Sequence, residues 1–288
     1  MSAIFVTGAT GTVGSSVVAE LRALGEPVVA GTRRSPDEAR LPAGTSTRLF
    51  DFSMTRDEMY AALAGCDRLF LMRPPAIADV ERRLFPLIDA ARDAGVRHIV
   101  FLSLQGVQMN RRTPHHAVET YLRKTRAPYT FLRPNFFSQN LSDTYARRIR
   151  ERGEIFVPAG RSRTAFIDAR DIGRVAAKVF TSPGHIGKAY TLSGEESLSY
   201  RRVAEIMTQE LGRHIVYTNP SEQEYLDALA AEGAPQDYLD VQKMIHRVVR
   251  MNISAFPNRM VRKLTGTPAT PFAQFVRDSA EAWSPNRP

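Results

Sequence analysis

The stretch best suited to chemistry is a glycine-rich turn near the N-terminus, in which Gly8, Gly11 and Gly14 stand three residues apart. The turn follows the apolar run 3–6 and opens a helical pattern over 15–24. One glycine permits a tight turn, one lets the backbone approach a pyrophosphate, and one lets the helix pack closely on the strand. The pyrophosphate would bind the N–H groups at the positive end of the helix dipole. The pattern predicts a nucleotide-binding βαβ unit; the alternative is a purely structural turn. The apolar residues expected on one helical face are Val17, Val18, Leu21 and Leu24.

Two adjacent arginines, Arg33 and Arg34, follow the second apolar run at 27–32. In a doubly wound sheet this position faces the adenosine ribose. An acidic residue there would bind the 2′-hydroxyl of NAD, whereas arginine accommodates the 2′-phosphate of NADP. The pair therefore predicts NADP(H) in preference to NAD(H), and the alternative is a charged loop end.

These residues need a sheet to hold them, and the chain alternates apolar runs with helical patterns as far as residue 135. Such alternation predicts an α/β fold with a Rossmann-type doubly wound parallel sheet. We expect residues 1–135 to form the NAD(P)-binding core. Residues 136–288 would complete the sheet and form a smaller, mostly helical C-terminal part that binds substrate. The expected strands are 3–6, 27–32, 47–52, 68–72, 98–103, 129–134 and 189–192, and the main expected helices are 15–24, 57–63, 80–94, 168–180 and 199–211.

Composition limits the remaining classes of function. The formal net charge is +9, yet the arginines are dispersed and no helix-turn-helix, zinc-ligand or RNA-reading motif accompanies them, so no nucleic acid partner is expected. No charged leader or membrane-length apolar run is visible, which predicts a cytoplasmic protein with no membrane association. The single cysteine, Cys66, excludes an intrachain disulfide and is expected to be a small buried residue. No metal site is expected.

Several longer motifs resemble the NmrA-like family of atypical short-chain dehydrogenases/reductases. This group includes bacterial quinone reductases, triphenylmethane reductases and NADP-sensing regulators. The resemblance covers essentially the whole chain and implies the fold and the cofactor more specifically than the substrate. The motifs that carry it lie at residues 7–14, 91–98, 115–123, 128–140, 166–171 and 272–277.

The resemblance implies roles for particular positions. Residues around the pyrophosphate would be Gly8, Thr10, Gly11, Thr12, Val13 and Gly14. Arg33 and Arg34 would bind the 2′-phosphate, and Asp51 and Phe52 would hold the adenine. Met72, Arg73 and Pro74 would contact the region between adenosine and nicotinamide, and Asn135 and Phe136 would lie beside the nicotinamide ring. Ser103, at the end of its strand, would also contact the cofactor. Phe137 and Tyr145 would contact the substrate, a small-molecule acceptor.

The expected catalytic helix departs from the usual pattern of short-chain dehydrogenases. The Tyr-x-x-x-Lys pair is missing, because Thr125 stands four residues after Tyr121. Instead, His115 and Glu119 stand four residues apart on one helical face. The carboxylate would favour the imidazolium, so that His115 could donate a proton to a reduced quinone oxygen. The alternatives are that the pair only pins the helix to the sheet, or that His116 is the relevant histidine.

The segment 241–277 contains seven Lys or Arg and no Asp or Glu. Within it, Lys243, Arg247 and Arg250 alternate with Met244, Val248 and Met251, which predicts a basic amphipathic helix. Such a helix can bind a partner, a membrane surface or an acidic substrate, but a solvated face over a packed one is the expected interpretation.

Together these features predict an NADPH-dependent reductase of a quinone-like or other conjugated, apolar acceptor. A homodimer is one possible assembly of this protein. The rival is a non-catalytic NADP(H) sensor that binds a protein partner.

Overall fold

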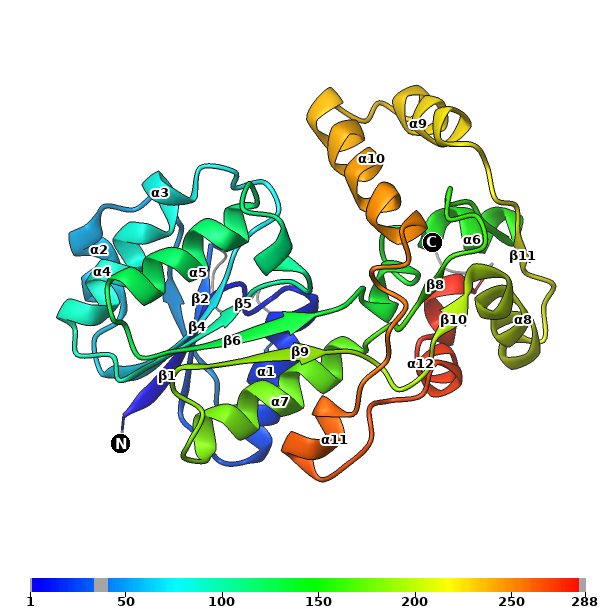
Figure 1. Cartoon of the computed structure of the whole chain (residues 1–288). Helices are drawn as coiled ribbons and strands as arrows, with labels where there is room; N and C mark the ends of the chain where they lie inside the picture. Colours follow the sequence, from blue (N-terminus) through cyan, green and yellow to red (C-terminus); the bar gives the residue numbers. More distant parts are fainter. Residues whose placement is uncertain (1, 34–40, 285–288) are drawn as a thin grey trace. The chain divides into compact units, whose positions relative to one another are not determined.

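The computed structural model describes residues 2–33 and 41–284. The chain divides into two compact units (Figure 1). The first unit contains residues 1–134, 169–192 and 260–267, and the second contains residues 135–168, 193–259 and 268–288. In the part of the chain that the structure describes, no helix is both long enough and apolar enough to cross a bilayer.

The first unit is built on a seven-stranded parallel sheet with the strand order β3-β2-β1-β4-β5-β6-β9. The order runs outward in both directions from β1, as in a doubly wound fold. The predicted Rossmann-type α/β fold is therefore confirmed. The strands are β1 (Ala3–Val6), β2 (Val28–Thr32), β3 (Ser46–Leu49), β4 (Cys66–Met72), β5 (His98–Leu102), β6 (Tyr129–Pro134) and β9 (Lys188–Leu192).

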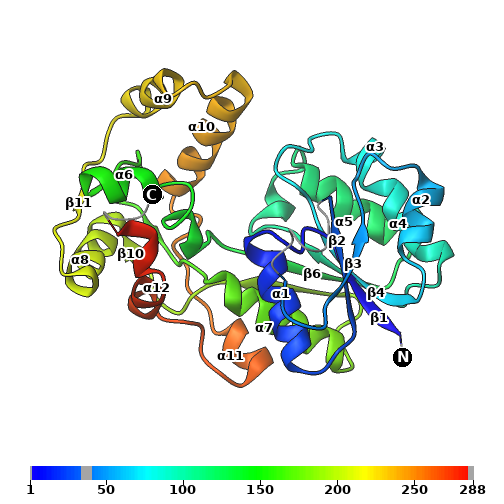
Figure 2. The same ribbon diagram turned by 180° about the vertical axis from the view of Figure 1, so that it is seen from behind.

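Helices cover both faces of this sheet. On one face lie α2 (Arg56–Ala62), α3 (Val80–Arg83), α4 (Phe85–Asp93) and α5 (Pro114–Lys124). The other face carries α1 (Thr12–Ala23) and α7 (Ala169–Thr181), which pack against each other and are best seen from behind in Figure 2. The short helix α11 (Met260–Thr265) packs on α7. Because both faces are covered, the central strands are buried along their whole length.

The core of the first unit follows the alternation of side chains along the strands. Phe5, Leu69 and Phe101 point to the α2–α5 side and belong to one apolar cluster there. Cys66 is buried in the same cluster, as predicted, and burial raises the pKa of its thiol.

Three local expectations need correction. The helix expected over 80–94 is two helices, because Pro86 at the start of α4 cannot continue the preceding turn. Leu24 is the C-cap of α1 and is 59% exposed, so it lies off the buried face formed by Val17, Val18 and Leu21. The third strand ends at Leu49 rather than Phe52.

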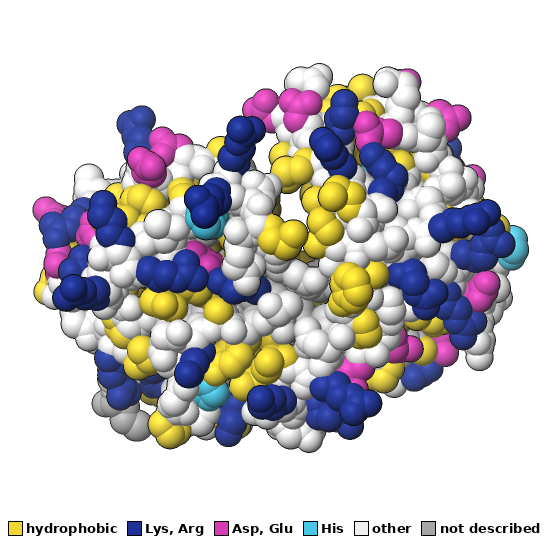
Figure 3. All heavy atoms as spheres, in the orientation of Figure 1, with side chains coloured by type: hydrophobic (Ala, Val, Ile, Leu, Met, Phe, Trp, Pro, Cys, Tyr) yellow, Lys and Arg dark blue, Asp and Glu magenta, His cyan; other side chains and the backbone are white. Residues whose placement is uncertain are grey.

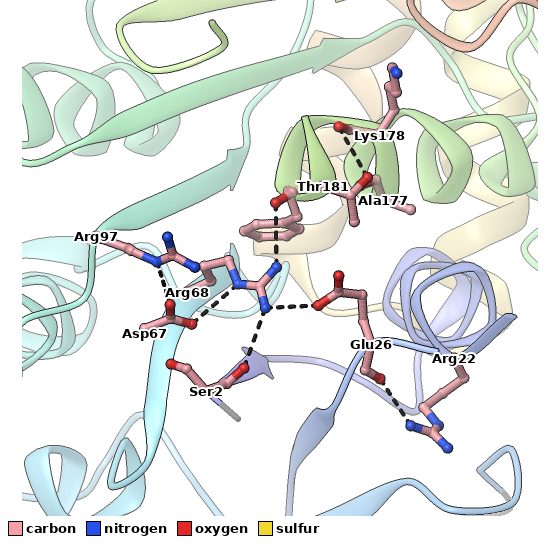
Figure 4. Close-up of polar contacts among 10 residues, drawn as sticks. Ser2, Arg22, Glu26, Asp67, Arg68, Arg97, Ala177, Lys178 and Thr181 are labelled. Atoms are coloured by element: carbon pink, nitrogen blue, oxygen red, sulfur yellow. Dashed lines mark hydrogen bonds and ion pairs between the residues drawn. The ribbon is translucent and has the colours of Figure 1, made fainter. Parts of the chain in front are cut away.

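A buried arginine ties together the amino ends of the strands, away from the edge where cofactors bind in such sheets (Figure 4). Arg68 on β4 forms ion pairs with Glu26 at 2.8 Å and with Asp67 at 3.2 Å. It also donates to the carbonyl oxygens of Ser2 and Phe180, each at 3.3 Å. Since one side chain reaches four segments of the chain, we assign this cluster a structural role.

The second unit is smaller and mostly helical. Its two short strand pairs are β7 (Glu154–Ile155) with β11 (Val216–Tyr217) and β8 (Arg163–Thr164) with β10 (Leu198–Ser199). Its core contains Trp283, Phe275 and Tyr200, which are almost fully buried. The helices are α6 (Ala146–Arg152), α8 (Tyr200–Leu211), α9 (Glu222–Ala231), α10 (Gln236–Arg250) and α12 (Phe272–Asp278).

Candidate functional site

The turn after β1 is anchored by Thr7. Its hydroxyl donates to the carbonyl oxygen of Phe70 at 3.0 Å and accepts from the backbone N–H of Met72 at 2.8 Å. These two bonds fix the carboxyl end of β1 against the carboxyl end of β4. The glycine-rich turn therefore starts from a rigid edge of the sheet.

A different feature of the structure explains the presence of glycine at each of the three positions of the turn. Gly8 has a φ of +62°, which L residues rarely adopt, and a Cβ there would lie 2.1 Å from the Met72 methyl group. A Cβ on Gly14 would lie 2.0 Å from the carbonyl oxygen of Gly8, so glycine lets α1 pack against the turn. At Gly11 the nearest atom to such a Cβ is the Gly8 oxygen at 3.4 Å, which is ordinary contact. The backbone conformation thus requires glycine at position 8, packing requires it at position 14, and the protein tolerates a side chain at position 11.

The N-terminus of α1 is suited to an anion. Gly11 is the N-cap and supplies no side-chain hydrogen bond, and the first turn contains no acidic residue. In contrast, the Thr113 hydroxyl caps α5 by accepting from the backbone N–H of His116. Thr10 and Thr12 are exposed beside the α1 terminus, whereas Val13 is buried under it. A phosphate group at this end would be stabilised by the helix dipole.

The predicted ribose-binding position lies at the end of β2. Arg33 is 82% exposed along its side chain and has its Nε atom 4.0 Å from the Asp51 carboxylate. Hydrogen bonds from Ser53 are the main cause that lowers the pKa of Asp51. Phe52 packs edge-to-face on Phe50 inside the core, which leaves little of its ring accessible to an adenine. Arg34 lies outside the described residues.

Strand β4 ends at Met72, and the loop after it begins with Arg73 and Pro74. Arg73 folds back on its own loop, and its Nη1 atom donates to the carbonyl oxygens of Pro74, Pro75 and Ile77 at 3.0, 3.0 and 2.6 Å. Its Nε atom is buried without a hydrogen-bond partner among the described residues. Burial lowers the pKa of this guanidinium, which nevertheless stays a cation at neutral pH.

Glu119 on α5 is the centre of a buried ion-pair network. Its carboxylate accepts from Arg133 at 2.8 and 2.6 Å, from Arg123 at 2.9 Å and from the Ser103 hydroxyl at 2.7 Å. Burial raises the pKa of Glu119, but these hydrogen bonds and the nearby arginines outweigh it and lower the pKa below its usual value. The network joins α5 to the carboxyl ends of β5 and β6. The hydroxyl of Ser103 is therefore already engaged within the protein.

His115 is half-buried near Phe101, with ring centroids 6.1 Å apart. Burial and the positive charge of Arg73 lower its pKa to about 4, and the opposing effect of Glu119 is smaller. Glu119 favours the imidazolium, as expected, but burial and the charge of Arg73 outweigh it. The imidazole is neutral at pH 7. The neighbouring His116 places its Nδ1 atom 3.2 Å from the carbonyl oxygen of Val107.

The remaining expected contacts lie in the second unit. Asn135 is buried: its side-chain N–H donates to the Ser254 carbonyl at 2.8 Å, and its side-chain oxygen accepts from the Phe136 N–H at 2.8 Å. Phe136 and Tyr145 pack against the core of this unit. Burial raises the pKa of Tyr145 well above its usual value. Phe137 is half-buried and is paired through its backbone with Ile167.

The sequence interpretation missed three residues that organise this region. Thr7 joins two strand ends, and Arg133 and Arg123 take up the Glu119 carboxylate. Thr7 and Arg133 could have been found from the sequence, because each is a polar residue at the end of an apolar run. Arg123 stands four residues after Glu119, which is the spacing of a helical ion pair.

The sequence pattern of the NmrA-like family matches residues 1–264. The chain belongs to the NmrA-like family. It is 34% identical over 287 residues to an NAD(P)H azoreductase of Xenophilus azovorans, an alignment that covers 97% of this chain and 99% of the relative. The resemblance stated from the motifs is thereby confirmed.

Solved structures of this family agree with the fold. An NADPH-dependent quinone oxidoreductase of Escherichia coli, complexed with NADPH, superposes with a TM-score of 0.85 at 27% identity and covers 96% of this chain and 99% of that chain. A triphenylmethane reductase of Citrobacter sp., complexed with NADP(H), superposes with a TM-score of 0.83 at 26% identity and has the same coverage.

Proposed function

We propose that this NmrA-like protein is an NADPH-dependent reductase that transfers hydride to a quinone-like or other conjugated, apolar acceptor. The observation that carries the proposal is the turn at the start of α1. The left-handed backbone explains Gly8 and packing explains Gly14, whereas Gly11 has room for a side chain and lacks one. Glycine at position 11 is accounted for by a pyrophosphate that approaches the backbone beside the uncapped helix terminus.

Preference for NADP(H) rests on Arg33. Its side chain is exposed at the end of β2, and the Asp51 carboxylate 4.0 Å away is too distant for a hydrogen bond. A 2′-phosphate would offer the guanidinium shorter, charge-assisted hydrogen bonds. The solved relatives that contain NADPH or NADP(H) support this assignment.

The cofactor, when bound, supplies the hydride, and the protein orients the reactants and excludes water. Two groups of the first unit can stabilise the charge that develops on the acceptor: Arg73 through its positive charge, and the neutral imidazole of His115 through a hydrogen bond that it donates. A conjugated acceptor spreads the negative charge it gains over its own ring system. A strong acid is therefore not required, which agrees with the missing Tyr-x-x-x-Lys pair.

Glu119 acts as a positioning residue in this proposal. Its oxygens are occupied by Arg133, Arg123 and Ser103, so it holds the middle of α5 against β5 and β6. The sensor function is less favoured, because the azoreductase and the quinone oxidoreductase that match nearly the whole chain carry reductase names, whereas the transcriptional regulator of the same fold is only 16% identical.

The test mixes the purified protein and NADPH with each member of a panel of quinones, azo dyes and cationic dyes. The loss of absorbance of the reduced nicotinamide measures NADPH oxidation. Calorimetric titration of NADPH and NADP⁺ runs in parallel. Oxidation above the protein-free control is the expected result. Tight NADPH binding without oxidation of any acceptor would contradict the reductase and favour the sensor.

A further inference from the structure

Arg73, the first residue after β4, carries a charge that the protein holds in one place. Its Nη1 atom donates to the carbonyl oxygens of Pro74, Pro75 and Ile77 at 3.0, 3.0 and 2.6 Å. The two prolines fix φ angles in the loop that supplies these acceptors. The guanidinium is therefore immobilised at the carboxyl edge of the sheet in the first unit.

The charge of Arg73 has no counter-ion within the part of the chain that the structure describes. No carboxylate there lies within ion-pair distance of its guanidinium, and its Nε atom is buried without a hydrogen-bond partner. The carboxylate of Glu119 on α5 is already taken up by Arg133. His115, on the same helix, is neutral at pH 7 because burial and the charge of Arg73 lower its pKa to about 4. An anion beside Arg73 would therefore gain a stabilisation that no group of the free protein takes up.

Arg73 differs from the basic residues of the surface. In Figure 3, Lys and Arg side chains are scattered over the visible face of the molecule, where water and salt screen their charges. Arg73 is half-buried, so its charge is screened less and acts more strongly on a neighbouring group.

The place of Arg73 in the sheet relates it to the reacting half of the cofactor. In a doubly wound sheet a dinucleotide lies across the carboxyl edge, with its pyrophosphate at the start of α1. Arg33 after β2 marks the expected adenosine side, so we expect the nicotinamide half on the other side of β1, over β4 and β5. Arg73 follows β4 directly. Since hydride transfer requires contact between the acceptor and the nicotinamide, the charge of Arg73 would act on the reacting group of the acceptor.

We propose that Arg73 selects the acceptor by charge, in favour of neutral quinones and against cationic dyes. The inference rests on the proposed function, because it names the substrate class of that reductase. A neutral quinone that accepts a hydride, one proton and two electrons, from NADPH becomes a hydroquinone monoanion, and NADPH becomes NADP⁺. A proton from water then completes the hydroquinone. The immobilised charge of Arg73 stabilises the negative charge that develops on the quinone oxygen.

A cationic dye changes its charge in the opposite sense. A triphenylmethane cation that accepts a hydride from NADPH at its central carbon becomes a neutral leuco dye, and NADPH becomes NADP⁺. Arg73 repels the cation as it binds, and the neutral product offers no negative charge to stabilise. Removal of this one charge should therefore affect the two acceptors in opposite directions. Damage to the fold or to cofactor binding would instead impair both.

The test compares menadione, a neutral quinone, with malachite green, a triphenylmethane cation, at saturating NADPH. Arg73→Gln should lower kcat/KM for menadione about tenfold and raise it for malachite green about threefold. Arg73→Met, a second neutral variant, should give the same two changes. Arg73→Lys keeps the charge and should change both values by less than about threefold.

A binding measurement accompanies the rates. Equilibrium dialysis with protein loaded with NADP⁺ gives the Kd of malachite green, which should fall about threefold in Arg73→Gln. Arg97→Gln is the matched control. It should leave the rates and this Kd within about twofold, because Arg97 pairs with Asp67 at the amino ends of the strands.

A fall in kcat/KM for both acceptors in the neutral variants, or no change for either, would overturn the proposal. A wild type that oxidises NADPH with malachite green and not with menadione would also overturn it, while leaving the reductase in place. A protein that oxidises NADPH with no acceptor, yet binds malachite green more tightly after Arg73→Gln, would contradict the reductase and leave the charge selection by Arg73 standing.

Discussion

Arg133 meets Glu119 through two parallel contacts, with its Nε atom 2.8 Å from one carboxylate oxygen and its Nη2 atom 2.6 Å from the other. Glu119 is only 1% exposed, so this charge depends on the pair for nearly all of its stabilisation. The Ser103 hydroxyl adds a third bond at 2.7 Å. The carboxylate that was expected to serve His115 instead holds α5 to β5 and β6.

Glu119→Gln should lower the free energy of unfolding by about 3 kcal/mol, because it leaves the Arg133 charge buried without its partner. Urea unfolding at pH 7 measures the change. Arg123→Gln is the control, since Arg123 is 43% exposed and its ion pair with Glu119 should contribute no more than about 1 kcal/mol. A smaller loss in Glu119→Gln than in Arg123→Gln would contradict the central role of the Arg133 pair.

Gly14→Ala and Gly11→Ala should separate packing from cofactor binding. The Gly14 variant should lose about 2 kcal/mol or more of stability, since its Cβ would meet the Gly8 carbonyl oxygen. The Gly11 variant should unfold within about 0.5 kcal/mol of the wild type but bind NADPH at least about tenfold more weakly. Urea unfolding and calorimetry give the two quantities. Unchanged NADPH affinity in Gly11→Ala would remove the support that this glycine lends to a pyrophosphate site.

Arg33→Ala should weaken NADPH about tenfold and NADH less than twofold, because only NADPH carries the 2′-phosphate. The double variant with Arg34→Ala should show the larger difference. Calorimetric titration of each cofactor measures it. Arg97→Ala is the charge-matched control, as Arg97 pairs with Asp67 at the amino ends of the strands. Equal losses for NADPH and NADH would show that the 2′-phosphate assignment is wrong.

The rate of quinone reduction should show no ionisation of His115 between pH 5 and 8. The lowered pKa of His115, about 4, keeps its imidazole neutral over that range. His115→Ala should lower kcat by about three- to tenfold by removing a hydrogen-bond donor, and His115→Gln should restore most of it. NADPH affinity should stay unchanged in both. A wild-type rate that falls as the pH rises through 6.5, in a step abolished by His115→Gln, would instead support an imidazolium donor.

His246 should make the protein less stable in acid. Burial lowers its folded pKa to about 4 from an ordinary 6.5, so the unfolded chain binds a proton that the folded chain does not. The free energy of unfolding is therefore highest above about pH 6.5. It falls by about 1.4 kcal/mol per pH unit as the pH falls toward 4. His246→Leu should therefore be nearly as stable as the wild type at pH 7 and more stable at pH 5, in urea unfolding at both values. His214→Gln, at an exposed histidine, is the control. A wild-type pH dependence that persists in His246→Leu would contradict the assignment.

Local patterns in the sequence determined the architecture of the first unit. The glycine spacing and the apolar runs of the strands are set by nearest neighbours and by the periods of helix and strand. The strands of the sheet could therefore be predicted along the sequence, whereas their spatial order was given by the structure. The break at Pro86 was also local, and it was missed because Leu84 and Phe85 continue the apolar pattern on either side.

The charges and exposures of the candidate site were decided by the tertiary structure. The spacing of His115 and Glu119 correctly indicated one helix, but Arg133, fourteen residues beyond Glu119, took the carboxylate when β6 came to lie beside β5. The sequence likewise placed Met244, Val248 and Met251 on one face of a basic helix. Contacts with Tyr225 on another helix turned that face outward. A side chain's pKa and exposure depend on the groups that surround it in space, and these are brought together only by folding.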